Sequence, residues 1–205
     1  MNSNINAIIF DLGGVILNID YHKTINAFKN IGISNFDELY TQAQQNHIFD
    51  KFETGQITPQ EFRNYITEQS DVKLSNQHID DAWNAMLLDF PKHRIDTLLK
   101  LKEMYPIYLY SNTNAIHLEA FRNSIEKEHG YKYVLEDLFL KTYYSHEIHL
   151  RKPNADGFLK IIQDNNLDIS TTLFIDDSEQ HILGAKKVGL QTIWLKDKDV
   201  TELFD

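Results

Sequence analysis

The chain contains no cysteine among its 205 residues, so disulfide bonds, thiolate nucleophiles and cysteine metal sites are excluded. Basic residues are also scarce, since 20 lysines and arginines stand against 30 aspartates and glutamates, a formal net charge of −10. This excess of acidic residues argues against a protein that binds nucleic acid by general electrostatic attraction. It does not argue against a phosphorylated substrate, because a metal ion and a few local cations can reverse the field within one cleft.

Long apolar runs are missing as well. No run approaches the roughly 20 residues that a membrane span requires. Residues 1–6 lack the basic region and the apolar stretch of a signal peptide. We therefore expect a cytoplasmic protein with no membrane partner. Hydrophobic residues at 42% and charged residues at 24% are ordinary values for a globular chain of this length.

Several short apolar runs end in polar residues, as buried parallel strands do when they leave a sheet. They cover residues 5–10, 107–110, 173–175 and 190–195, with a weaker candidate at 139–144. Helical patterns alternate with these runs from residue 91 onward. The sequence therefore predicts an α/β fold built on a doubly wound parallel sheet with right-handed crossovers.

The segment from residue 16 to 90 shows helical patterns without a convincing strand. Thr58 and Glu61 form a capping box around Pro59, which predicts the start of a helix, and a second helix is predicted over 74–88. Aromatic residues recur at helical spacing and predict a core for this segment rather than a substrate platform: Phe49, Phe52, Phe62, Tyr65 and Trp83. We expect an inserted small α-helical cap at 16–90 and a core domain formed by 1–15 and 91–205.

Polar groups follow three of the predicted strands. Asp11 follows the first, Ser111 and Asn112 the second, and Asp176 and Asp177 the third. Because ligands bind beyond the carboxyl ends of parallel strands, we expect these side chains to lie together. Carboxylates from two strands can hold Mg²⁺.

Phosphoryl transfer depends mainly on positioning and charge stabilisation, and these residues can supply both. Asp11 can attack phosphorus with one oxygen while the other binds the metal. Ser111 can donate to a phosphate oxygen, and Lys152 can neutralise the nucleophile and the transferred group. Gly13 and Gly14 leave the backbone accessible to the ligand. The residues alone thus indicate a Mg²⁺-dependent phosphoryl-transfer enzyme with Asp11 as its nucleophile.

Four short motifs resemble those of the haloacid dehalogenase-like (HAD) hydrolase superfamily, in the right order along the chain. They lie at residues 11–15, 110–113, 151–153 and 174–178. The helical insertion resembles the cap of subclass I. Within the family, the chain is similar to sugar phosphatases of the α-D-glucose-1-phosphate phosphatase type. The resemblance implies a HAD-like Rossmannoid core and a phosphatase of small phosphorylated metabolites, with sugar phosphates as the leading substrate class.

The same resemblance implies individual roles. Asp11 would carry an aspartyl-phosphate intermediate. The implied Mg²⁺ ligands are Asp11, the main-chain carbonyl of Gly13, Asp177 and, close by or through water, Asp176. The implied contacts with the substrate phosphate come from Ser111, Asn112 and Lys152.

Gly13 departs from the family pattern, because most phosphatases of the family have an aspartate there as general acid/base. Such a group contributes about 10²–10⁴-fold in rate. Three explanations stay open: substrates with good leaving groups, an acid/base from the insertion, or weak turnover in a protein that mainly binds. The candidates from the insertion are Asp20, His22 and Glu53.

A metal-free hydrolase of the dehalogenase type, which attacks carbon, is a further alternative. It is disfavoured because Asp176 and Asp177 would then put uncompensated negative charge beside Asp11. His181 is expected on an exposed helix face. The sequence is compatible with a monomer or a homodimer.

Overall fold

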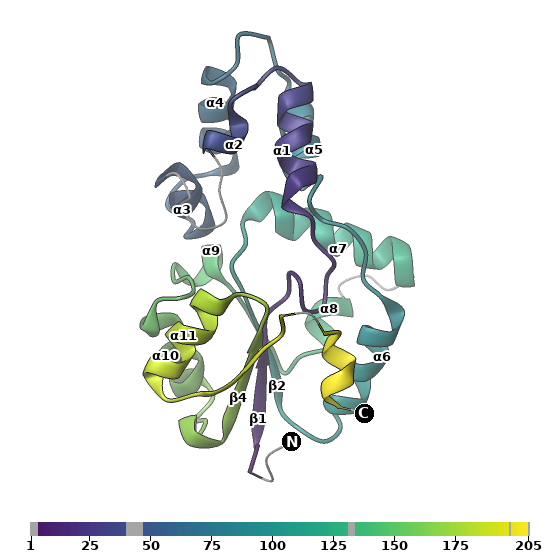
Figure 1. Cartoon of the computed structure of the whole chain (residues 1–205), viewed down its shortest axis with the longest axis vertical. Helices are drawn as coiled ribbons and strands as arrows, with labels where there is room; N and C mark the ends of the chain where they lie inside the picture. Colours follow the sequence, from purple (N-terminus) through teal and green to yellow (C-terminus); the bar gives the residue numbers. More distant parts are fainter. Residues whose placement is uncertain (1–3, 40–46, 131–133, 197, 205) are drawn as a thin grey trace.

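The computed structural model describes residues 4–39, 47–130, 134–196 and 198–204. Its centre is a parallel five-stranded sheet with the strand order β3-β2-β1-β4-β5. The central strands β2, β1 and β4 are labelled in Figure 1. The strands are β1 (Ala7–Phe10), β2 (Ile107–Ser111), β3 (Lys141–Tyr144), β4 (Thr172–Asp176) and β5 (Gln191–Trp194). The prediction of a doubly wound parallel sheet is confirmed, including the weaker strand candidate, which becomes β3 at one edge.

Helices cover both faces of the sheet. They are α6 (Lys92–Leu101), α7 (Ala115–His129), α8 (Val134–Asp137), α9 (Ser145–Ile148), α10 (Ala155–Asp164) and α11 (Glu179–Val188). Short 3-10 helices occupy Ile169–Thr171 and Val200–Leu203. In β1, Ile8 and Phe10 pack in the cluster that includes α6 and α7, whereas Ala7 and Ile9 pack in the cluster with α10 and α11. Because successive side chains of a strand point to opposite faces, one short apolar strand serves two cores.

The helical insertion between β1 and β2 has its own aromatic core. It contains α1 (Tyr21–Asn30), α2 (Phe36–Leu39), α3 (His47–Glu53), α4 (Pro59–Glu68) and α5 (Asn76–Asn84). The rings of Phe52 and Phe62 stack at 4.4 Å, and those of Phe49 and Trp83 at 5.4 Å. The prediction that these aromatic residues form a core is confirmed. Ile116 of α7 belongs to the same cluster, so the insertion packs directly on the rest of the molecule.

Two linkers connect the insertion to the sheet, and they pair with each other. The N–H of Leu88 donates to the carbonyl of Asn18, and the N–H of Asp20 donates to the carbonyl of Met86, both at 2.9 Å. The prediction of a helix through residue 88 is therefore wrong at its end: α5 stops at Asn84. The reason is that residues 86–88 exchange helical hydrogen bonds for this antiparallel pairing. Within the described ranges, no helix has the length and apolar character needed to cross a bilayer.

Candidate active site

The carboxyl ends of three strands bring predicted site residues to one edge of the sheet. β1 lies between β2 and β4, so Asp11, which follows β1, sits beside the last residues of its neighbours. Those residues are Ser111 and Asp176. The N–H of Asp11 donates to the carbonyl of Ile175 at 2.9 Å and extends the pairing with β4 by one residue. This edge is where open α/β sheets bind ligands.

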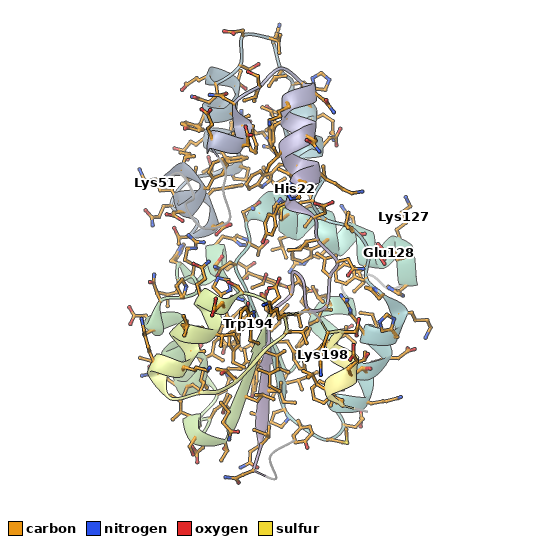
Figure 2. All side chains as sticks on the ribbon, viewed as in Figure 1. His22, Lys51, Lys127, Glu128, Trp194 and Lys198 are labelled. Carbon is orange, nitrogen blue, oxygen red and sulfur yellow. The ribbon has the colours of Figure 1, made fainter. Side chains whose placement is uncertain are left out.

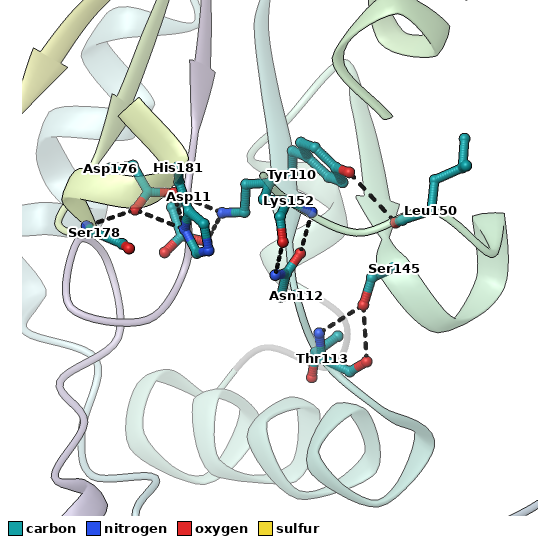
Figure 3. A network of polar contacts seen from close by, with 10 residues as sticks. All are labelled: Asp11, Tyr110, Asn112, Thr113, Ser145, Leu150, Lys152, Asp176, Ser178 and His181. Carbon is teal, nitrogen blue, oxygen red and sulfur yellow. Dashed lines mark hydrogen bonds and ion pairs between the residues drawn. The ribbon is translucent and has the colours of Figure 1, made fainter. Parts of the chain in front are cut away.

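Lys152 is completely buried between two carboxylates (Figure 3). Its Nζ lies 2.6 Å from Oδ1 of Asp11 and 2.7 Å from Oδ2 of Asp176. Burial alone would lower the pKa of Lys152, but the two carboxylates raise it, so the ammonium group stays charged. Lys152 thus holds a positive charge against Asp11, where it can stabilise a phosphoryl group under attack.

Asp176 is held by three neighbours. The N–H of Ser178 donates to Oδ1 at 2.7 Å, and Nδ1 of His181 lies 3.0 Å from Oδ2, which also accepts from Lys152. Burial would raise the pKa of Asp176, but Lys152 and His181 lower it. The carboxylate is therefore ionised, and Nδ1 of His181 must be the donor because a carboxylate only accepts.

The expectation that His181 lies on an exposed helix face is wrong, because only 13% of its side chain is exposed. His181 lies in the first turn of α11, and its side chain points toward Asp176 at the end of β4 (Figure 3). Helical periodicity alone does not report such a contact. The available signal was the closeness of His181 in sequence to the strand-end residue Asp176.

Three carboxylates form a group able to hold a cation. One oxygen each of Asp11, Asp176 and Asp177 lies within 4.8 Å of the others. Burial, followed by repulsion from Asp11 and Asp176, raises the pKa of Asp177 to about 7. This excess of negative charge fits a hard divalent cation such as Mg²⁺, which prefers oxygen ligands. Asp11 and Asp177 line the adjoining pocket together with Gly13, whereas Asp176 is engaged by Lys152.

Two glycines leave room for this arrangement. Gly14 has a φ of +75°, and a Cβ there would collide with Oδ2 of Asp177. Gly13 lies under Ile19 of the first linker, whose Cδ1 would be 3.1 Å from a Cβ at position 13. A side chain at position 13 would therefore require Ile19 to shift by a few tenths of an ångström.

Ser111 and Asn112 line the pocket at the end of β2. The amide of Asn112 makes two hydrogen bonds of 2.9 Å with the backbone of Lys152, donating to its carbonyl and accepting from its N–H. The side chain of Asn112 therefore positions the segment that carries Lys152. A direct contact of Asn112 with phosphate stays a prediction, as does the contact of Ser111.

The helical insertion supplies part of the pocket wall. Tyr21 and Glu53 line the pocket opposite the strand ends. Burial, and then the charges of Asp177 and Asp11, raise the pKa of Tyr21, so its hydroxyl remains protonated at neutral pH.

Of the three acid/base candidates from the insertion, Glu53 lies in the pocket wall and is paired with Arg151 at 3.0 Å. Asp20 instead caps α1 by accepting from the N–H of His22 at 2.9 Å. His22 itself lies exposed on the surface (Figure 2). The structure therefore brings one of the three candidates to the site and leaves the other two outside its lining.

A parallel sheet with a buried lysine and grouped carboxylates at its carboxyl edge defines the class of the protein: an α/β enzyme of Rossmann-like architecture. The model of the haloacid dehalogenase-like hydrolases matches residues 5–189. The chain belongs to this family, and the prediction of a hydrolase of the HAD superfamily is confirmed.

Two bacterial species supply similar proteins that cover almost all of this chain. The chain is 30% identical to a D-ribitol-5-phosphate phosphatase from Bacteroides thetaiotaomicron over 185 residues, 90% of this chain and 89% of that protein. A HAD family enzyme from the same species, solved as wild type with magnesium and inorganic phosphate, is 40% identical, with a TM-score of 0.89 over 98% of this chain and 100% of that one. A predicted HAD-like hydrolase from Porphyromonas gingivalis is 28% identical, with a TM-score of 0.88 over 98% of both chains.

Proposed function

We propose that this protein is a Mg²⁺-dependent phosphoric monoester hydrolase of sugar or sugar-alcohol phosphates. The observation that carries the proposal is the position of Asp11 at the pocket floor, 2.6 Å from the buried Nζ of Lys152 and grouped with Asp177. The similarity to a D-ribitol-5-phosphate phosphatase supports the substrate class. Magnesium and phosphate in the solved Bacteroides enzyme support the cofactor.

In the proposed reaction, a carboxylate oxygen of Asp11 attacks phosphorus and the bond to the substrate oxygen breaks, giving an aspartyl-phosphate. The leaving oxygen takes a proton from water, since Gly13 cannot supply one, and departs as the free alcohol. Water then attacks the phosphorus and releases inorganic phosphate and the free carboxylate. Lys152 offsets the charge on Asp11, and the hydroxyl of Ser111 donates to a phosphate oxygen. Asp11, Asp177 and the carbonyl of Gly13, with Asp176 close by, would hold Mg²⁺, which would supply further charge neutralisation.

The helical insertion acts as a cap in this proposal. Residues 16–90 would form the cap, and residues 1–15 and 91–205 the catalytic core. Tyr21 and Glu53 bring the insertion into contact with the substrate space, so its closure excludes bulk water and limits substrates to small molecules.

A second candidate, a weakly active protein that mainly binds phosphorylated ligands, is favoured by Gly13 and by the packing of Ile19 over it. The metal-free dehalogenase alternative has less support, because Asp11, Asp176 and Asp177 are grouped around a single buried lysine, Lys152, and a cation would offset the remaining negative charge.

The test is phosphate release from sugar phosphates, sugar-alcohol phosphates and an acyl phosphate, with Mg²⁺ and with a chelator. We expect release only with Mg²⁺, and none from Asp11→Asn. Mg²⁺-dependent binding of phosphate without turnover by the wild type would support the binding protein instead. Undiminished activity in chelator, on phosphates or on a halo-acid, would overturn the metal-dependent mechanism.

A further inference from the structure

Arg151 joins the catalytic half of the molecule to the helical insertion. It directly precedes Lys152, and its guanidinium group pairs with two carboxylates of α3, Asp50 and Glu53. The distance from Nη2 of Arg151 to Oε2 of Glu53 is 3.0 Å. One arginine thus fixes two side chains that lie one turn apart on the same helix.

These two carboxylates face different spaces. The side chain of Glu53 is 11% exposed and lines the same pocket as Asp11. The side chain of Asp50 is 42% exposed and lines a separate surface groove with Pro153 and Asn154. Arg151 lies between them and borders both spaces. Glu53 is therefore the partner that a ligand in the pocket would meet.

The end of α3 is fixed by further contacts, so the position of Glu53 does not depend on Arg151 alone. A ring nitrogen of His149 lies 2.8 Å from the carbonyl of Thr54, to which it donates. Gly55, at a φ of +66°, packs so closely on the main chain of His146 that a Cβ would collide with its carbonyl. The main chain that carries Glu53 is thus fixed before a substrate arrives, which lowers the entropic cost of binding.

The charges in the pocket favour an uncharged leaving part of the substrate. Of the described residues that line the pocket, only Arg151 is a lysine or arginine, and two carboxylates already pair with it. Once the metal and Lys152 have taken up the phosphate, a second anionic group would face Glu53. A hydroxyl group, in contrast, can donate to a carboxylate in a short, strong hydrogen bond.

We propose that Glu53, held in place by Arg151, binds hydroxyl groups of the substrate and selects neutral polyol phosphates over phosphates that carry a carboxylate. Glu53 is then a specificity-determining residue contributed by the insertion. The inference rests on the proposed function for its reaction, but it concerns the half of the substrate that carries no phosphorus.

The experiment compares wild type, Glu53→Gln and Asp50→Asn on three substrates: D-ribitol 5-phosphate, acetyl phosphate, which has no hydroxyl, and 3-phosphoglycerate, which carries a carboxylate. We expect Glu53→Gln to raise KM for ribitol 5-phosphate by about 10–100-fold, the loss of one or two hydrogen bonds to a charged group. KM for acetyl phosphate should change less than about 3-fold, and the preference against 3-phosphoglycerate should shrink. Asp50→Asn, the matched control, should leave KM for ribitol 5-phosphate and for acetyl phosphate nearly unchanged, because Asp50 does not line the pocket.

An equal rise in KM for ribitol 5-phosphate and acetyl phosphate, or no rise for either, would overturn the proposal. So would a wild-type preference for 3-phosphoglycerate. Calorimetry with Mg²⁺ separates the role of Glu53 from the proposed hydrolysis. It measures the binding of ribitol 5-phosphate and of inorganic phosphate to the wild type and to Glu53→Gln. A loss of ribitol 5-phosphate affinity alone supports the role of Glu53 even if no phosphate is released, in which case the proposed hydrolysis fails.

Discussion

At the scale of single residues, Lys152 decides the charge balance of the site. It is fully buried, and its single positive charge contacts both Asp11 and Asp176 directly. Removing one member of a buried ionic group is far more costly than removing an exposed one, because the charges left behind have neither water nor a partner.

We therefore expect Lys152→Met to lower the free energy of unfolding by about 3–5 kcal/mol in metal-free buffer and to abolish phosphate release. Urea denaturation measures the first effect. The matched control is Lys160→Met, since the side chain of Lys160 is 40% exposed where it pairs with Asp164. Its effect should stay within about 0.5 kcal/mol. Equal urea midpoints for the two variants would contradict the assigned role of Lys152.

Gly14 allows a second prediction, because Gly130 has the same left-handed backbone conformation but different neighbours. Gly14 and Gly130 have φ values of +75° and +71°. A Cβ on Gly14 would strike Asp177, whereas one on Gly130 would meet nothing within 4 Å among the described residues. Alanine at either position costs roughly 1 kcal/mol for the left-handed backbone. Gly14→Ala should in addition raise the Mg²⁺ concentration for half-maximal activity by at least about 10-fold.

Titration of activity with Mg²⁺ checks this prediction, with Gly130→Ala as the control that keeps the wild-type midpoint. The same Mg²⁺ midpoint in Gly14→Ala and wild type would show that Asp177 does not need the space over Gly14.

At the scale of elements, α5 and α7 are joined through His117. Its Nε2 lies 3.0 Å from the carbonyl of Trp83, and its ring stacks on that of Trp83 at 4.9 Å. Its Nδ1 lies 3.2 Å from Nδ2 of Asn114, from which it accepts. Burial lowers the pKa of His117 to about 4, so the ring is neutral in the folded protein.

Stability should therefore fall on acidification. Between pH 6.5 and 4 the unfolded chain binds a proton at this histidine and the folded chain does not. The free energy of unfolding contributed by His117 decreases across that window, by about 3 kcal/mol at most. Urea denaturation at pH 7 and pH 4.5 should show a smaller loss in His117→Gln than in wild type. His78→Gln, which changes an exposed histidine, should keep the full loss, and equal losses in all three proteins would contradict the prediction.

The elements also show what could be inferred from the sequence. Parallel strands that are buried on both faces are uniformly apolar, so their ends and the polar residues after them could be located, and topology then brought Asp11 beside Asp176. Contacts between the insertion and the core could not be located, because Arg151 and Asp50 are 101 positions apart and no periodicity connects them. Pairing of the two linkers shortened α5 for the same reason, since Asn18 and Leu88 meet only in the folded chain.

At the scale of the whole molecule, three of the 30 acidic residues are grouped in the site: Asp11, Asp176 and Asp177. The pKa of Asp177 is raised to about 7, above the unfolded value of 3.8, so in metal-free protein stability falls as the pH rises from 3.8 to 7 and the loss is complete above pH 7. Neutralising this residue should stabilise the metal-free protein while removing its response to metal.

Thermal unfolding at pH 8 tests this. With Mg²⁺ at 100 times its dissociation constant, the wild type should gain about 2.7 kcal/mol, which corresponds to roughly 5–10 °C in Tm. Asp177→Asn should melt above the wild type in chelator and show little further change with Mg²⁺. A metal-free variant that melts below the wild type, or one that gains as much from Mg²⁺, would show that Asp177 is not a metal ligand.

The aromatic core of the insertion affects how the insertion could be exchanged between related proteins. Ile116 belongs to that core and His117 stacks on Trp83. The core of the insertion is therefore completed by one face of α7, which lies outside the insertion in the sequence. In a chimera, the insertion of a relative would replace the insertion of this protein. The aromatic residues of the relative would then pack against Ile116 and His117 of α7, whose side chains do not match them in shape. Residues 116 and 117 should therefore be exchanged together with residues 16–90, so that the transplanted unit is discontinuous in sequence although continuous in space.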